Sequence, residues 1–440
     1  MRVLVVGGGA REHIIAERVA NEGHDVYAFL KNENPGILSV AKEARIAEER
    51  NISELTEFAK RRRIDFAIIG PEDPLEAGIS DELSSAGVLC YGPKSSAARI
   101  ETSKAFARQL MLRHRIPGSP EFRIFDTPGD AIDFVKACDF PVVVKPSGLT
   151  GGKGVKVEGE HLSGKGEVCR YITEIFEEKI GGERKVVIEE RLEGEEFSVQ
   201  AICDGRHLLP LPLVQDHKRA YEGDKGPNTG GMGSYSMSDG LLPFVREKER
   251  ERALEIMKRV VDAMKEEGDE FRGTLYGGFM LTSGGIKLLE FNARFGDPEV
   301  MNVLSVTRGK FVDTLYSAAE GNLKASIDFE NSATLCRYYV PVGYGSKPLA
   351  GAEITVDEAC IRESGCHLYY ASVRKKDGKI STTSSRSFAL VSKAEEPWLA
   401  IPAIEKAGHC VSGMVYTRKD IGTAEEIEQR RRNGEKLRRG

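Results

Sequence analysis

The stretch PVVVKPSGLTGGKGVKV, residues 141–157, decides the fold of the middle of this chain. Its glycine-rich segment, 148–154, lies between two apolar runs. A Walker A motif has a longer spacer before its Gly-Lys pair, then Ser or Thr, and it opens a helix. Here Gly154 follows Lys153, and the next residues continue as a strand. We therefore predict a flexible loop between two antiparallel strands, whose backbone N–H groups approach phosphate oxygens. An ordinary hairpin turn is the alternative, but it needs fewer glycines and no lysine.

Lysines near this loop are the next candidates for phosphate contacts. Lys145 closes the first strand, and Lys153 lies in the loop itself. A lysine that ends an apolar run often only extends its charged head into water. Beside a phosphate-binding loop, however, Lys145 is better interpreted as a second phosphate partner. Lys104, within a helix predicted over 95–113, has the same potential but little support of its own.

The segment Lys287–Arg294 reads KLLEFNAR and has the alternation of a strand. A period of two places Glu290, Asn292 and Arg294 on one face. Carboxylate and amide oxygens are hard ligands suited to magnesium beside nucleotide phosphates. A guanidinium group next to them can stabilise charge on a transferring phosphoryl group. A solvated strand is the alternative, but further acids follow at Asp297.

The first 100 residues alternate short apolar runs with helical segments, which predicts a parallel sheet covered by helices. Ligands bind beyond the carboxyl ends of such strands, and the Gly7–Gly9 turn lies at one of these ends. A dinucleotide fingerprint would need a third glycine where Glu12 stands. The helix that follows could still hold a single phosphate at its N-terminus.

A long glycine-rich loop at 215–236 separates two regular regions. Such loops in compact domains are usually functional or disordered, and this one has mixed charge rather than low complexity. We expect it to cover a substrate. His217 within it is at least as well interpreted as a structural or substrate-orienting residue as a catalytic base.

The chain has 440 residues and a formal net charge of −5, whereas proteins that wrap nucleic acid usually have a basic surplus. We therefore expect small-molecule substrates and no nucleic-acid partner. The basic cluster at 430–432 is interpreted as a solvated helix face. No apolar run approaches the roughly 20 residues that span a bilayer, so we expect no membrane contact and a cytoplasmic location.

The eight cysteines are scattered, with no CxxC pair and no histidines at the spacing of a zinc finger. We expect reduced, mostly buried thiols rather than a zinc site or a disulfide scaffold.

Taken in order, several motifs resemble those of phosphoribosylamine–glycine ligases of purine biosynthesis, a family of the ATP-grasp superfamily. The motifs are GGGAREH at 7–13, SK at 103–104, GGKG at 151–154, IEE at 188–190, QDHKR at 215–219, GPNTGGMG at 226–233, EFNARFGDPE at 290–299 and RKDIG at 418–422. They span nearly the whole chain. The two long strings at 226–233 and 290–299 are specific to this family within the superfamily.

The resemblance implies a mixed α/β and α+β fold in three domains. A Rossmann-like domain would span 1–101, an ATP-grasp domain 102–326 with a small lid at about 120–190, and a mixed α+β domain 327–440. It also implies the reaction, in which ATP phosphorylates glycine and phosphoribosylamine attacks the glycyl phosphate. We expect a monomer or weak homodimer. The alternatives are another ATP-grasp ligase or carboxylase, and a non-catalytic nucleotide- or NAD(P)-binding module.

The resemblance also implies roles for individual residues. The catalytic residues would be Arg294, Lys153, Asp216 and Lys218. ATP would be bound by Lys104, Lys145, Lys153, Glu189, Glu190, Arg191, Leu192 and Glu196. Glycine and phosphoribosylamine would be bound by Gly7, Gly9, Asn228, Thr229, Gly230, Gly231 and Asp297. Magnesium or manganese would be held by Glu290 and Asn292.

Overall fold

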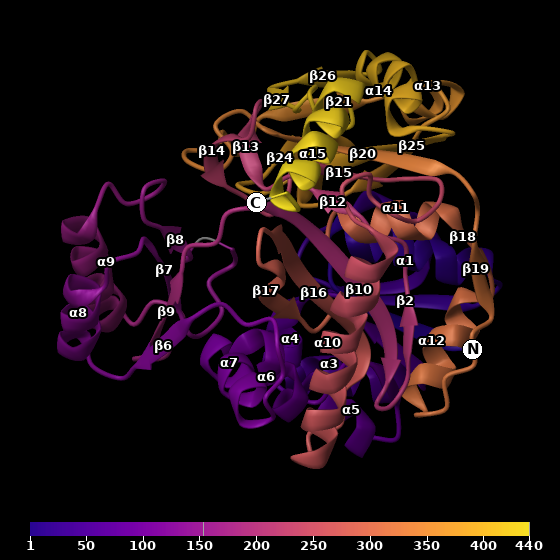
Figure 1. Ribbon diagram of the computed structural model, residues 1–440. Helices are drawn as coiled ribbons and strands as arrows, with labels where there is room; N and C mark the ends of the chain where they lie inside the picture. Colours follow the sequence, from indigo (N-terminus) through magenta and orange to yellow (C-terminus); the bar gives the residue numbers. More distant parts are fainter. Residues whose placement is uncertain (153, 440) are drawn as a thin grey trace.

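The computed structural model describes residues 1–152 and 154–439 and is shown as a ribbon in Figure 1. The N-terminal region is a five-stranded parallel sheet with the strand order β3-β2-β1-β4-β5. Its strands are β1 (Arg2–Val6), β2 (Asp25–Leu30), β3 (Ala41–Ile46), β4 (Phe66–Ile69) and β5 (Leu89–Tyr91). Its helices are α1 (Ala10–Asn21), α2 (Pro35–Val40), α3 (Ile52–Arg62), α4 (Glu72–Glu76), α5 (Ile79–Ser85) and α6 (Ser95–Thr102).

Alternate residues of β1 pack into different cores, as expected for a strand covered on both faces. Val3 and Val5 belong to the core that contains the apolar residues of α1. Leu4 and Val6 belong to a second core with residues of α3 and α5. The Gly7 turn begins at the carboxyl end of β1 and leads into α1.

The lid is a separate lobe, at the left of Figure 1, with its own apolar core. Its four strands run antiparallel in the order β6-β9-β7-β8, and two helices cover one face. The strands are β6 (Phe122–Phe125), β7 (Val142–Pro146), β8 (Lys156–Val157) and β9 (Val186–Glu190), and the helices are α8 (Pro128–Ala137) and α9 (Lys165–Glu178). The predicted antiparallel strands around 148–154 are therefore β7 and β8.

The central sheet is antiparallel, in the order β11-β10-β16-β17. It contains β10 (Glu195–Asp204), β11 (Leu208–Pro210), β16 (Arg272–Thr282) and β17 (Gly285–Asn292). The helices α10 (Glu247–Glu266) and α12 (Phe311–Ala319) pack against it. Helix α7 (Lys104–Arg113) packs on α10, and α11 (Glu299–Val306) packs on the C-terminal sheet. The short strands β18 (Thr307–Gly309) and β19 (Ile327–Phe329) pair nearby.

The C-terminal sheet draws strands from two distant parts of the chain. Its path is β12-β15-β20-β25-β22, with β27 paired to β20. Its strands are β12 (Gln215–Asp216), β15 (Gly233–Ser236), β20 (Ala333–Pro341), β22 (His367–Tyr370), β25 (Phe388–Ala394) and β27 (Val415–Tyr416). Because β12 and β15 flank the loop of interest, that loop lies against the C-terminal region. Within it, β13 (Arg219–Tyr221) pairs with β14 (Lys225–Asn228).

A second small sheet and three helices complete the C-terminal region, which is yellow to orange in Figure 1. The sheet consists of β21 (Glu353–Val356), β23 (Val373–Lys376), β24 (Lys379–Thr382) and β26 (Val411–Gly413). The helices are α13 (Glu358–Glu363), α14 (Ile401–Gly408) and α15 (Ala424–Leu437). None of the helices in the described ranges is both long and apolar enough to cross a membrane.

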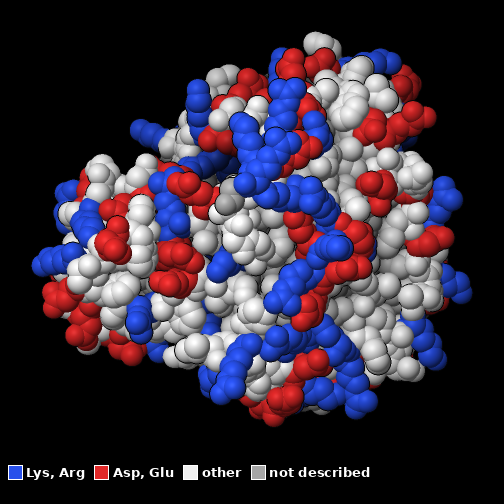
Figure 2. Space-filling view, in the orientation of Figure 1, with Lys and Arg blue, Asp and Glu red and all other residues white. Residues whose placement is uncertain are grey.

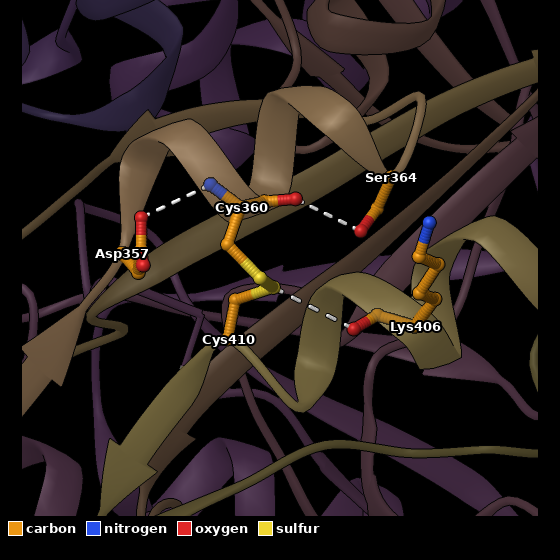
Figure 3. The surroundings of a disulfide bond; sticks show 5 residues. All are labelled: Asp357, Cys360, Ser364, Lys406 and Cys410. Carbon is orange, nitrogen blue, oxygen red and sulfur yellow. Dashed lines mark hydrogen bonds between the residues drawn. A yellow bond between two sulfur atoms is a disulfide. The ribbon is translucent and has the colours of Figure 1, made fainter.

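A disulfide joins Cys360 of α13 to Cys410, which follows α14 (Figure 3). The prediction of reduced thiols is therefore wrong for this pair. The two residues are 50 apart in sequence, and the fold brings their Cα atoms to 5.8 Å. The other six cysteines are free thiols, and all but Cys169 are buried, as predicted. The spacing of cysteines in the sequence does not predict this disulfide, because the pairing depends on how α13 and α14 pack.

Candidate active site

Lysine side chains from two elements reach the cleft between the lid and the central sheet. Lys145, on β7, forms an ion pair with Glu189 at 2.7 Å and donates a hydrogen bond to the carbonyl oxygen of Leu289 at 2.9 Å. Lys104, the first residue of α7, donates to the carbonyl oxygen of Gly148 at 3.0 Å. Burial lowers the pKa of Lys104 despite the nearby charge of Glu290. Both lysines thus lie where the sequence predicts phosphate contacts.

Strand β17 presents the predicted polar face to this cleft, with one irregularity. The ladder between β16 and β17 shifts register after Gly278, which pairs with Glu290, whereas Phe279 pairs with Leu288. Leu289 therefore bulges out of the ladder. A bulge frees a carbonyl group from pairing; here the freed oxygen of Leu289 accepts from Lys145 and from Arg108. The predicted alternation holds from Glu290 onward but fails at Leu289, and the buried residue before the bulge is Leu288.

Glu290 lies opposite a third lysine. The Nζ atom of Lys218 is 3.5 Å from Glu290 and 3.9 Å from Glu196, which projects from β10. Burial alone would raise the pKa of Glu290, but the positive charges led by Lys218 outweigh it and lower the pKa to about 2. The same pairing raises the pKa of Lys218 although burial opposes it. Both groups are therefore charged at neutral pH.

In the hinge between lid and central sheet, residues 189–192, the charged side chains already form hydrogen bonds with other residues of the protein. Arg108 binds Glu189 with two hydrogen bonds, at 2.6 and 3.1 Å. Glu190 accepts from the backbone of Glu121, and Arg191 donates to the carbonyl oxygen of Glu158. These side chains stabilise the hinge, and the backbone N–H groups of Glu190 and Arg191 also donate within the protein, to the carbonyl oxygens of Glu121 and Pro141.

Arg294 is held by two acidic residues that sequence reasoning missed. Its guanidinium group lies 3.2 Å from Glu72, at the start of α4, and 3.2 Å from Glu101 of α6. Glu101 also accepts the backbone N–H of Ala293 at 2.7 Å. These carboxylates raise the pKa of Arg294 against the effect of burial. The Gly-Pro-Glu turn at the end of β4 could have pointed to Glu72; nothing in the sequence points to Glu101.

The 226–233 loop is held by a C-terminal residue that was also missed. Arg386 lies 2.9 Å from Asp297 and donates to the carbonyl oxygens of Gly230 and Gly231. Its guanidinium group stacks on the ring of Tyr338, whose hydroxyl donates to Asp297. The structure therefore brings together the predicted Asp297 and glycine loop by means of a residue almost 90 positions farther along the chain.

The rest of the loop contacts Lys218. Thr229 donates hydrogen bonds to the carbonyl oxygen of Lys218 from both its backbone N–H and its hydroxyl, each at 2.8 Å. Asn228 ends β14 and pairs with Arg219. A Cβ atom added to Gly152 would lie 3.9 Å from the carbonyl oxygen of Thr229, so the lid loop reaches this loop. The predicted Lys153 lies outside the described residues.

Asp216 is buried beside the same loop, and its Oδ1 atom has no hydrogen-bond partner among the described residues. A Cβ atom at Gly231 would come within 2.8 Å of that oxygen, so the backbone passes very close. Burial and the charge of Glu299 raise the pKa of Asp216 well above its ordinary value.

The Gly7–Gly9 turn is filled by Glu12, the residue that replaces the third glycine of a dinucleotide motif. The backbone N–H of Gly9 donates to Glu12 at 2.7 Å. A Cβ atom at Gly7 would meet Glu12 at 2.7 Å, and the φ of Gly7 is +116°, so glycine is required there. Asn34 donates to the carbonyl oxygens of Gly8 and Tyr370, which joins the turn to the C-terminal region.

The metal ligands predicted on β17 fit a hard cation in chemistry and charge. Glu290 is ionised at neutral pH, and Asn292 projects from the same face, with its amide oxygen 3.5 Å from Arg294. Within residues 1–152 and 154–439, no group of three or more His, Cys, Asp or Glu residues is arranged to hold a metal ion. A cation here would therefore need phosphate oxygens to complete its shell, as magnesium beside a nucleotide does.

A parallel N-terminal sheet, an antiparallel lid, and a cleft with lysines opposite a carboxylate strand define an ATP-grasp protein. Models of the phosphoribosylglycinamide synthetase N domain, ATP-grasp (A) domain and C domain match residues 1–101, 102–300 and 334–424. The chain belongs to the phosphoribosylglycinamide synthetase family.

Related proteins with named activities match this chain over almost its whole length. The phosphoribosylamine–glycine ligase of Methanothermobacter thermautotrophicus is 50% identical and covers 100% of both chains. That of Pyrococcus furiosus is 44% identical and covers 98% of this chain and 96% of its own. The crystal structure of phosphoribosylamine–glycine ligase from Thermotoga maritima has a TM-score of 0.81 at 28% identity, covering 96% of this chain and 100% of that one. The biotin carboxylase domain of a Hydrogenobacter thermophilus carboxylase, bound to MgADP, shares only the fold, with a TM-score of 0.73 at 18% identity.

Proposed function

We propose that this protein ligates glycine to phosphoribosylamine with ATP, giving glycinamide ribonucleotide, ADP and phosphate, in purine biosynthesis. The observation that carries the proposal is the face of β17: Glu290 lies opposite Lys218, and Arg294 is clamped beside it. Lys218 connects this face to the 226–233 loop, which is typical of the family: its Nζ atom lies 3.5 Å from Glu290 and its carbonyl oxygen accepts from Thr229.

In the first step, a glycine carboxylate oxygen attacks the γ-phosphorus of ATP. A new P–O bond forms, the bond to the β-phosphate bridging oxygen breaks, and ADP leaves. The anionic reactants repel each other, and we assign Lys145, Lys104 and Arg294 to offset that repulsion. Lys153 has the same assigned role from its sequence position. Clamping by Glu72 and Glu101 keeps Arg294 oriented without deprotonating it.

In the second step, the amine of phosphoribosylamine attacks the carbonyl carbon of glycyl phosphate. The C–N bond forms, the C–O bond to phosphate breaks, and the amine loses a proton. We assign that proton to Asp216, because its buried Oδ1 atom has no hydrogen-bond partner among the described residues and its raised pKa favours proton uptake. Lys218, charged and hydrogen-bonded through its carbonyl to Thr229, is placed to stabilise the acyl phosphate oxygens.

We assign the nucleotide to the cleft between lid and central sheet. The backbone of the hinge through Leu192 would meet adenine, and Glu196 would accept from the ribose hydroxyls. Glu290 and Asn292 would hold Mg²⁺ or Mn²⁺, which when bound neutralises phosphate charge. The donor set does not discriminate between the two ions.

Glycine and phosphoribosylamine are assigned to the space between the N-terminal turn and the 226–233 loop. Gly7 and Gly9 would lie near the ribose phosphate, and Asn228, Gly230 and Asp297 near the glycine. Because Glu12 already accepts the N–H of Gly9, a phosphate group there must use other donors of the turn. A cytoplasmic location, a monomer or weak homodimer, and the domain boundaries at 101 and 326 remain predictions from the sequence.

Release of ADP tests the proposal against another ATP-grasp ligase or carboxylase. We expect ADP to form only when ATP, glycine and freshly prepared phosphoribosylamine are all present, together with a ribosylated glycinamide product detected by mass. Equal ADP release without phosphoribosylamine, or with bicarbonate in place of glycine, would reject the assignment.

A further inference from the structure

The C-terminal helix α15 lies next to the start of β10, near the top of Figure 1. The basic cluster at 430–432 was interpreted as a solvated face, and for Arg431 and Arg432 this is confirmed: they pair with acids of the same helix. Lys and Arg side chains accordingly cover this part of the surface in Figure 2. The interpretation is wrong for Arg430, whose side chain is only 14% exposed.

Arg430 lies among three carboxylates from three elements. It is 2.8 Å from Glu195 of β10 and 2.8 Å from Asp224, and it also pairs with Glu426 one helical turn before it. Asn433 donates a second hydrogen bond to Glu195 at 2.7 Å. The two oxygens of Glu195 are thus each bound by a different residue of α15.

Two of the groups that α15 holds, Glu195 and His217, each precede a residue of the proposed active site by one position. Glu195 is buried against α15, and the next residue of the strand, Glu196, turns its side chain to the opposite side, where it faces Lys218. Glu426 binds the buried ring of His217 at 3.1 Å, and the next residue is Lys218 itself. The contact between Lys218 and Glu196 therefore joins two segments that are both held by hydrogen bonds to α15.

We propose that Arg430 is a positioning residue for the nucleotide site, which acts through Glu195 on Glu196. The same helix acts through Glu426 and His217 on Lys218. Without Arg430, three carboxylates would face each other with reduced compensation, and at least one would move toward water. Such a movement shifts the start of β10, and displacements on the order of 1 Å in a site can cost about 100-fold in rate.

The test compares Arg430→Gln with Arg432→Gln in the full chain. Arg432 is 63% exposed and pairs with Glu428 of its own helix, so it is a matched control for charge and location. The measurements are kcat, the KM values for ATP, glycine and phosphoribosylamine, and the Kd of ADP with Mg²⁺ by calorimetry. The inference rests on the proposed ligase function, but ADP binding is read without turnover.

For Arg430→Gln we expect the KM for ATP and the Kd of ADP to rise on the order of tenfold, because the displacement of β10 moves Glu196. Arg432→Gln should match the wild type. Asn433→Ala, which keeps Arg430, should raise the same two constants by a smaller factor, and it decides the matter if Arg430→Gln does not fold.

Wild-type ADP affinity in both Arg430→Gln and Asn433→Ala would overturn the inference. So would a lowered kcat with all three KM values and the Kd unchanged, since that indicates loss of folded protein rather than displacement of Glu196. If the wild type binds ADP but ligates no glycine, the proposed function fails while the effect of Arg430 on ADP binding still tests this inference.

Discussion

Glu290 is opposed by lysines from three directions, and their charges hold the pKa of its carboxyl group at about 2 although burial alone would raise it. It is therefore ionised at any pH at which the protein is assayed. We expect Glu290→Gln, which keeps the shape but removes the charge, to lower kcat/KM for ATP on the order of 100-fold or more. The measurement is steady-state ADP release at saturating glycine and phosphoribosylamine.

The control for this substitution is Glu251→Gln on the exposed side of α10, which removes the same charge far from the cleft. Thermal unfolding should leave both variants near the wild-type Tm. Wild-type kcat/KM in Glu290→Gln would contradict the assignment of a metal and phosphate role to β17.

Asp216 differs from Glu290 in that its pKa is raised, by burial and by Glu299. A carboxyl group with a raised pKa is protonated below that pKa and can accept a proton only above it. We therefore expect kcat to rise with pH through the pKa of Asp216. Asp216→Asn should lower kcat and flatten this acidic limb, as measured by the dependence of kcat on pH. An unchanged limb in the variant would show that another group takes the proton.

Among single residues, the sequence predicts the position of those side chains that belong to one local pattern. Period two identified Glu290, Asn292 and Arg294, because the strand keeps its pleat after the bulge. Periodicity does not reveal the bulge at Leu289, since it depends on the pairing with β16. Arg386 was missed for a related reason: its contact with Asp297 joins the central and C-terminal regions, and no local motif marks it.

Among the elements, the disulfide between α13 and the residue after α14 was not predicted. Closing a loop of 50 residues restricts the unfolded chain and typically stabilises a fold by about 2–4 kcal/mol. We expect Cys360→Ser, or reduction of the wild type, to lower the Tm by several degrees while leaving kcat unchanged, because the bond is remote from the cleft. Calorimetry with and without reductant is the measurement, and Cys169→Ser is the control thiol.

A Tm that is insensitive to reductant, together with two titratable thiols in the unfolded oxidised protein beyond the six free ones, would show that Cys360 and Cys410 are not bonded.

Helices and strands were predicted best where the apolar pattern is strong. The apolar pattern predicts strands at 2–6, 25–30 and 141–145 and a helix at 246–266, and β1, β2, β7 and α10 lie there to within one residue at each end. Strand β3 was missed because its sequence, AKEARI, is mostly polar and lies at the sheet edge. The expected single helix at 95–113 is split at Ser103, whose hydroxyl caps α7 by accepting the N–H of Phe106. A Ser within an apolar pattern does not by itself indicate a break.

The whole molecule joins its three regions through shared structure rather than through linkers. Strands β12 and β15, which lie on either side of the segment containing the 226–233 loop, pair into the sheet of the C-terminal region. Asn34 links the Gly7–Gly9 turn to that same region, and Arg386 links the 226–233 loop to it. The family and the fold class predicted from the motifs are confirmed, because those motifs are distributed along the whole chain. The sharing of one sheet between regions depends on the long-range pairing of β15 with β20, and no single sequence motif indicates that pairing.

The central claim is that this cleft phosphorylates the carboxylate of glycine before the amine attacks. Glycine labelled with ¹⁸O in its carboxylate tests that claim directly in the complete reaction, with mass analysis of the phosphate released. The account predicts that each phosphate contains one ¹⁸O atom, because the oxygen attacked by the γ-phosphoryl group leaves with it. Phosphate without label, formed in step with ligated product, would contradict the account.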